Sequence, residues 1–223
     1  MSSAAVDNDI LHKGAWYGLL RELLSMIPAA PGETLVLGQA KFVVGKRLER
    51  QGKRGAANAQ HALERLSSVL AELALVEPTN EETAFAARLE NAAQKAGLAL
   101  DSGESLLCSL VVHRDLKHFA TGDKRAICAM ETLAQTHGEM ARAAGRVLCL
   151  EQLFVRLLAA ATDPGVVRRA VCDEHHVDRA LTSCFSCSSP EIGPDQWTEG
   201  LSSYIESVRA DAPSMLSVTV PEE

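Results

Sequence analysis

Residues 4–11, AAVDNDIL, place two carboxylates where a short apolar segment gives way to a helix. Residues 4–6 have the composition of a buried strand, and from Ile10 to Met26 the apolar side chains recur at the helical period. In an α/β fold, the residues that follow such a strand lie at the edge of the sheet where ligands bind. Asp7 occupies that place in the first unit of the chain.

The rest of the chain continues this alternation. Apolar runs predict strands at residues 34–37, 118–121 and 147–150, and residues 73–76 either close the preceding helix or form another strand. Helical spacing occurs at residues 39–51, 56–73, 80–96 and 102–112, and again at residues 153–161 and 166–184. We expect an α/β domain over residues 1–150, with a parallel central sheet flanked by helices. Residues 151–223 are expected to form a helical extension that ends in a loose tail.

Length and charge limit the function classes. The 223 residues are 47% apolar and can bury a core, and their net charge of −7 argues against a surface that binds nucleic acid everywhere. The apolar stretch at residues 147–161 contains Glu151 and Arg156 and falls short of the ~20 residues of a membrane span. Without a signal segment, we expect a cytoplasmic protein whose six cysteines are buried thiols.

Three acidic residues stand at similar places in this pattern. Asp7 ends the first strand, Asp123 follows the strand in FATGDKRA, and Glu104 lies at a helix start in LDSGESLL. If the two strands are neighbours, the three carboxylates converge, and close carboxylates repel unless a cation neutralises them. Hard divalent cations prefer such oxygen ligands. The pattern therefore predicts an Mg²⁺ or Mn²⁺ site that hydrolyses phosphodiester bonds.

The same segments resemble PIN-domain proteins, metal-dependent ribonucleases that include the toxins of bacterial toxin–antitoxin pairs. The matching segments are VDNDIL at the first strand, GESLLCSLVV at the helix with an internal acid, and ATGDKRA at a later strand end. The resemblance covers roughly residues 4–150 and implies a three-layer PIN-like fold that cleaves RNA. It implies Asp7, Glu104 and Asp123 as catalytic metal ligands, Asp9 as a supporting ligand, and Thr121 as a supporting group.

The resemblance also implies binding partners, but one acidic residue that the family usually carries is missing from this chain. Lys124 is expected to contact phosphate, an antitoxin or another protein would be the partner, and a homodimer is a family-level expectation. Family members usually carry a Glu in the second helix, where this chain has Gln39, Lys41 or Val43. The alternative is a non-catalytic PIN-like module with an incomplete acidic set that binds RNA or protein.

Each acid also has a structural interpretation. Asp101 and Glu104 have the spacing of a capping box, in which each side chain bonds to the backbone of the other residue. Asp7 and Asp123 stand where Asp is favoured as a helix cap or turn residue.

A basic run offers a second candidate site, because phosphate contacts supply most non-specific affinity for nucleic acid. Its alternative is a solvated helix face. The residues are Lys41, Lys46, Arg47, Arg50, Lys53 and Arg54.

Three cysteines and a histidine in the C-terminal extension form a third candidate site, for zinc. Cys172, His175, Cys184 and Cys187 supply two pairs of zinc ligands, although the pairs are closer together than in common zinc modules. Buried thiols and surface histidines are the alternative.

Overall fold

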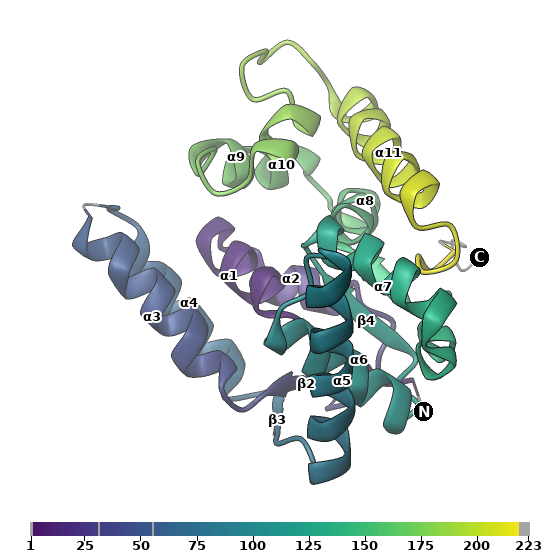
Figure 1. Ribbon diagram of the computed structural model, residues 1–223. Helices are drawn as coiled ribbons and strands as arrows, with labels where there is room; N and C mark the ends of the chain where they lie inside the picture. The colour runs from purple at the N-terminus through teal and green to yellow at the C-terminus, as the bar shows by residue number, and fades with distance from the viewer. Residues whose placement is uncertain (1, 31, 55, 219–223) are drawn as a thin grey trace.

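A computed structural model describes residues 2–30, 32–54 and 56–218 as a parallel five-stranded sheet covered by helices on both faces (Figure 1). The strand order is β3-β2-β1-β4-β5, so the first strand is central. This architecture confirms the expected α/β class with a parallel sheet and is consistent with a three-layer PIN-like fold. The strands are β1 Ala4–Val6, β2 Thr34–Leu37, β3 Ala74–Val76, β4 His118–Thr121 and β5 Val147–Cys149.

Helices connect and extend these strands. Between strands they are α1 Asn8–Tyr17, α2 Leu20–Ser25, α3 Ala40–Lys53, α4 Ala59–Leu70, α5 Asn80–Ala96, α6 Ser102–His113, α7 Lys124–Thr136 and the 3₁₀ helix η1 Gly138–Ala143. After β5 they are α8 Leu150–Ala160, α9 Pro164–Asp173, α10 Arg179–Cys184 and α11 Pro194–Asp211. Each helix of the described part of the chain is too short or too polar to cross a membrane.

Side chains of the short strands alternate between two cores. Ala4 and Val6 of β1 belong to the core formed with α1 to α4 and α8 to α10, whereas Ala5 belongs to the core formed with α5 to α7. Helix α11 joins both, because Trp197 lies in the first core and Val208 in the second. The helices after residue 150 therefore pack directly against the sheet domain.

The predicted single helix at residues 10–26 is wrong in one respect: it divides at Gly18. Gly18 has φ +67°, a left-handed conformation that glycine adopts without strain, and its N–H bonds to carbonyls of the preceding turn. The chain then restarts as α2. A side chain at Gly14 would also lie 2.9 Å from Leu20, so the two helices approach closely there.

The C-terminal region also differs from expectation. The predicted helix at residues 166–184 is two helices, since Asp178 caps a new helix start by accepting from the N–H of Leu181. A loose tail was expected at the end of the extension. Helix α11 follows Gly193, and Leu216 then forms a parallel bridge with Val147 of β5. Residues 219–223 of that expected tail lie outside the described residues.

Candidate functional site

The carboxyl edge of the sheet brings Asp7 and Asp123 to the same end of neighbouring strands. Strands β1 and β4 pair in parallel, and the N–H of Asp7 bonds to the carbonyl of Ala120 at 2.9 Å. Buried Thr121 connects the two acids: its hydroxyl donates to Asp7 Oδ2 at 3.0 Å and accepts from the N–H of Asp123 at 3.2 Å. Thr121 thereby fixes the position of the Asp7 carboxylate.

Glu104 approaches this edge from the start of α6. Its Oε2 accepts from the N–H of Asp101 at 2.8 Å, and its own N–H donates to Asp101 Oδ1 at 2.8 Å, so the expected capping box is confirmed. Burial, followed by the charges of Asp101, Asp7 and Asp123, raises the pKa of Glu104 to about 8. Glu104 is thus electrostatically part of the same acidic group.

Asp7 is a second buried carboxylate. Its side chain caps α1 by accepting from the N–H of Asn8 at 2.6 Å. Burial, and after it the nearby charge of Asp9, raises the pKa of Asp7 to about 6, although its hydrogen bonds oppose the shift. Within residues 2–30, 32–54 and 56–218, no ion pair within 4.0 Å engages Asp7, Asp101 or Glu104. When ionised, Asp7 and Glu104 are therefore stabilised by hydrogen bonds and helix N-termini without a cationic side chain, and burial favours their protonated forms.

Asp9, the expected supporting ligand, is neutralised by cations of the chain itself. Lys13 Nζ lies 2.5 Å from Asp9 Oδ2 and 2.6 Å from Asp178 Oδ2, and Arg47 Nη1 lies 3.7 Å from Asp9 Oδ1. Burial opposes the charge on Lys13, but the two carboxylates more than offset it and raise its pKa. Gly122 is required beside this pair, because a Cβ there would lie 2.5 Å from Asp9 Oδ2.

The sequence argument missed Lys13 and Asp178. The i, i+4 spacing of Asp9 and Lys13 was a local signal for the first pair. Asp178 had no such signal, since it reaches Lys13 only through the packing of the C-terminal helices on α1.

Asp123 also has a cation beside it. Arg125 Nη2 lies 2.8 Å from Asp123 Oδ2, and the backbone N–H of Arg125 donates to Oδ1 at 2.8 Å, which caps α7. Burial would raise the pKa of Asp123, but these contacts with Arg125 lower it. Lys124, the expected phosphate contact, has its Nζ 4.9 Å from the centre of the Tyr204 ring on α11.

The donor chemistry of this edge fits a hard divalent cation, because carboxylate oxygens predominate. In their present rotamers, however, no three Asp, Glu, His or Cys side chains of the described residues lie where they could hold a metal ion. Cation binding by Asp7, Glu104 and Asp123 therefore requires these side chains to move from their present positions.

The second-helix Glu that the resemblance would require was already missing from the sequence. Helix α3 has no acidic residue in its first turn, and Gln39 stands at its N-cap. The structure thus supplies no substitute for that ligand at the start of α3.

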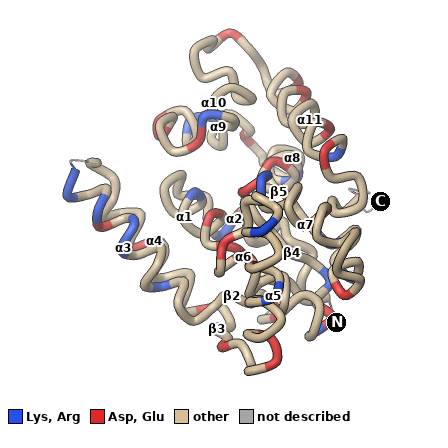
Figure 2. Tube along the Cα trace, viewed as in Figure 1, with Lys and Arg blue, Asp and Glu red and all other residues tan. Residues whose placement is uncertain are grey.

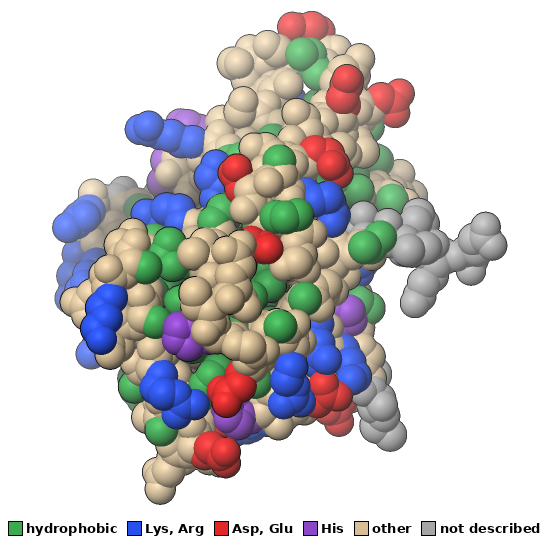
Figure 3. All heavy atoms as spheres, turned by 45° about the vertical axis from the view of Figure 1, so that its right-hand side comes forward, with side chains coloured by type: hydrophobic (Ala, Val, Ile, Leu, Met, Phe, Trp, Pro, Cys, Tyr) green, Lys and Arg blue, Asp and Glu red, His purple; other side chains and the backbone are tan. Residues whose placement is uncertain are grey.

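The basic run lies on α3 and at its C-cap, and all six side chains are exposed. Figure 2 shows them as blue segments along α3, which lies beside α4 at one side of the molecule. In the turned view of Figure 3, Lys and Arg gather toward the left, whereas Asp and Glu are scattered. Because Arg47 contacts Asp9, this basic face adjoins the acidic edge.

The structure contradicts the zinc interpretation and the expectation of six thiols. Cys172 and Cys187 form a disulfide, so these two sulfurs cannot both serve as thiolate ligands. Cys184 is a free, partly buried thiol, and His175 is exposed. The spacing of the four residues reflects a closed loop between α9 and the end of α10.

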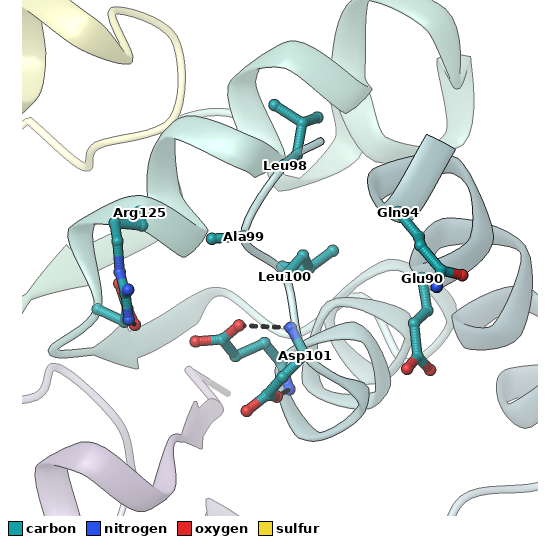
Figure 4. Close-up of a pocket in the computed structure, with 9 residues that line it drawn as sticks. Glu90, Gln94, Leu98, Ala99, Leu100, Asp101 and Arg125 are labelled. Carbon is teal, nitrogen blue, oxygen red and sulfur yellow. Dashed lines mark hydrogen bonds and ion pairs between the residues drawn. The ribbon is translucent and has the colours of Figure 1, made fainter. Parts of the chain in front are cut away.

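A cavity of about 420 Å³ opens beside Glu104 and Asp123 (Figure 4). It extends from the acidic edge to α5 and gives these two carboxylates access to a small molecule.

Comparisons with known proteins found no match: no family model matches the chain, and no curated protein or solved structure is significantly similar.

Proposed function

We propose that the protein is a ribonuclease that hydrolyses phosphodiester bonds with Mg²⁺ or Mn²⁺ held by Asp7, Glu104 and Asp123. The observation that carries this proposal is the pair of buried carboxylates, Asp7 and Glu104, at the ligand-binding edge of a parallel sheet. A buried carboxylate without a partner is costly, so it is either protonated, as the raised pKa values of both groups indicate, or it binds a cation that displaces the proton. Among the described residues, neither carboxylate has an ion-pair partner.

The residues of the edge have distinct roles in this proposal. When bound, the cation lowers the pKa of a water molecule and stabilises charge on the phosphate. Thr121 and the N–H of Asn8 hold Asp7 in place, and the N–H of Asp101 holds one oxygen of Glu104, which leaves the other free. Lys13 keeps Asp9 turned toward α1, so that Asp9 supports the edge rather than repelling substrate.

The RNA strand is proposed to run along α3, because its exposed basic residues can contact phosphates. Binding there brings a strand to the acidic edge through Arg47. The cytoplasm, where RNA is abundant, is the proposed location, and an antitoxin or another protein is the proposed regulator. A homodimer belongs to the same proposal.

A second candidate is a non-catalytic module that binds RNA or protein. Two ion pairs favour the non-catalytic module: Arg125 pairs with Asp123, and Lys13 pairs with Asp9. Internal cations at two of the acids reduce the need for a metal ion.

Cleavage of single-stranded RNA with added Mn²⁺ separates the two candidates. Asp123→Asn is expected to lower the rate by about a hundredfold, the effect of disturbing a metal site. Asp163→Asn is the matched control, because Asp163 also caps a helix two residues before a partner N–H and pairs with Arg169 at its surface. Equal cleavage by the wild type and Asp123→Asn would overturn the proposed site, and equal losses in both variants would point to capping alone. Thermal unfolding of each variant shows whether it folds.

A further inference from the structure

The cavity beside the acidic edge has walls of different chemistry. Glu90 and Gln94 lie one helical turn apart on α5, and Leu98–Leu100 form an apolar segment between α5 and α6. Asp101, Glu104, Asp123 and Arg125 complete the lining. In Figure 4, Arg125 lies on one side of the segment and Glu90 and Gln94 lie on the other. The cavity therefore has a polar wall of Glu90 and Gln94 on one side and a cationic group, Arg125, on the other.

The polar wall is free to meet a ligand. Glu90 and Gln94 are exposed, and no ion pair within 4.0 Å engages Glu90 in the part of the chain that the structure describes. Two residues at i and i+4 on one helix face present a carboxylate and an amide side by side. A ligand that both donates and accepts hydrogen bonds along one edge would match this pair.

We infer that this cavity is a nucleoside subsite that binds guanosine of the RNA strand, an inference that rests on the proposed ribonuclease function. Guanine carries two adjacent N–H donors, at N1 and N2, which match the two oxygens of the Glu90 carboxylate. Its O6 accepts from the Gln94 amide. A flat base can lie against Leu98 and Ala99, and the volume of about 420 Å³ is within the range of small-ligand sites.

The other bases match the wall less well. Uracil presents one N–H between two carbonyls, and these carbonyls would face the Glu90 carboxylate. Adenine presents a ring nitrogen acceptor where guanine presents N1–H. These bases would make fewer hydrogen bonds to the Glu90 and Gln94 side chains, and their acceptors would be repelled by the Glu90 carboxylate.

Arg125 would set the orientation of the nucleotide in the subsite. Its guanidinium lies at the acidic side of the cavity, where it pairs with Asp123. With a cation on Asp123, the guanidinium of Arg125 would be available to bind a non-bridging phosphate oxygen. The base would then lie toward α5 and its phosphate toward Asp7, Glu104 and Asp123.

Neutral nucleosides test the subsite without a metal ion or cleavage. We would titrate guanosine, inosine, adenosine and uridine into the protein in EDTA and follow the side-chain amide of Gln94 by NMR. Guanosine should bind most tightly, and inosine, which lacks the N2 amino group, about tenfold more weakly, as expected for one lost bond to a charged group.

Glu90→Gln should remove most of this difference between guanosine and inosine, because the amide cannot accept both donors. Glu81→Gln is the matched control, since Glu81 is exposed at the first turn of the same helix and does not line the cavity. Equal binding of the nucleosides, no binding, or an unchanged difference in Glu90→Gln would each overturn the inference. Such failures are distinguishable from failure of the nuclease proposal, which is measured by Mn²⁺-dependent cleavage.

Discussion

Glu104 is a buried carboxylate that closes a capping box and also faces the other acids. Its pKa lies near 8 in the folded chain against an ordinary value of 4.5, and burial is the main cause. The protonated form is therefore favoured by folding. Its contribution to stability is complete below pH 4.5 and is lost as the pH rises to about 8.

The substitution Glu104→Gln tests whether Glu104 lowers the stability of the fold as the pH rises. Gln also serves at the third position of a capping box, so the cap is retained while the ionisable group is removed. Relative to the variant, the wild type should lose free energy of unfolding between pH 4.5 and about 8, as measured by urea unfolding at several pH values. Parallel curves for the two proteins across this window would contradict the prediction.

Arg125 competes with a cation for Asp123. Its side chain is 73% exposed, and exposed pairs of this kind contribute little to stability. Arg125→Gln should therefore raise the affinity for Mn²⁺ by about two- to fivefold, the factor that corresponds to such a pair. Isothermal titration of Mn²⁺ measures the change. Arg169→Gln, which breaks the similar pair with Asp163, should leave the affinity unchanged; a matching rise there would show a general charge effect.

At the scale of elements, the loop between α9 and α10 connects the C-terminal region to the acidic edge. The Cys172–Cys187 disulfide closes it, Asp178 within it pairs with Lys13, and the His176 ring packs edge-on against Trp16 at 5.4 Å. The loop thereby holds Lys13 against Asp9. Stability of this loop and geometry of the edge are coupled through one buried lysine.

Replacing both cysteines with serine should lower the free energy of unfolding by about 3 kcal/mol, the loop-closure contribution for roughly this loop length. The separation of 15 residues between the cysteines sets this value. Urea unfolding under non-reducing conditions measures it. Cys184→Ser, at the end of α10 between the two bonded cysteines but outside the disulfide, should have a much smaller effect. An unchanged stability in the double variant would mean that the disulfide contributes nothing in solution.

The sequence predicted the strands and helix starts whose signal lies in a few adjacent residues. The apolar segments at β1, β2 and β4 and the D-S-G-E sequence of α6 carried their structure in a few adjacent residues. The division at Gly18 was missed because a glycine in a helical pattern has more than one outcome. Helix α11 was missed although the sequence carries a signal for it: its buried residues Trp197, Leu201, Ile205 and Val208 recur every three or four positions, and Pro194 stands at its start. The disulfide, by contrast, depends on how α9 and α10 pack.

At the scale of the whole molecule, the chain gathers its acids where three helices begin. Asp7, Asp101 and Asp123 cap α1, α6 and α7, so the same residues that start the helices build the acidic edge. Capping and cation binding are compatible, because each carboxylate retains unused lone pairs. The sequence places Asp7 and Asp123 after neighbouring parallel strands, and Lys13 and Arg125 lie within four residues of the acids that they pair with, whereas Asp178 reaches Lys13 only through packing.

Divalent cations should stabilise the whole fold in a manner that depends on pH. A cation binds the ionised forms of Asp7 and Glu104, whose pKa values are raised to about 6 and about 8, so protons compete with it. Mn²⁺ at 100 times its dissociation constant should add about 2.7 kcal/mol at pH above 8, and the gain should shrink as the pH falls toward 6. Thermal unfolding with and without Mn²⁺ measures this gain. The double variant Asp7→Asn with Glu104→Gln should lose it, whereas Asp163→Asn should keep it. An equal gain in the double variant would place the cation elsewhere on the acidic surface and remove the physical basis of the proposed site.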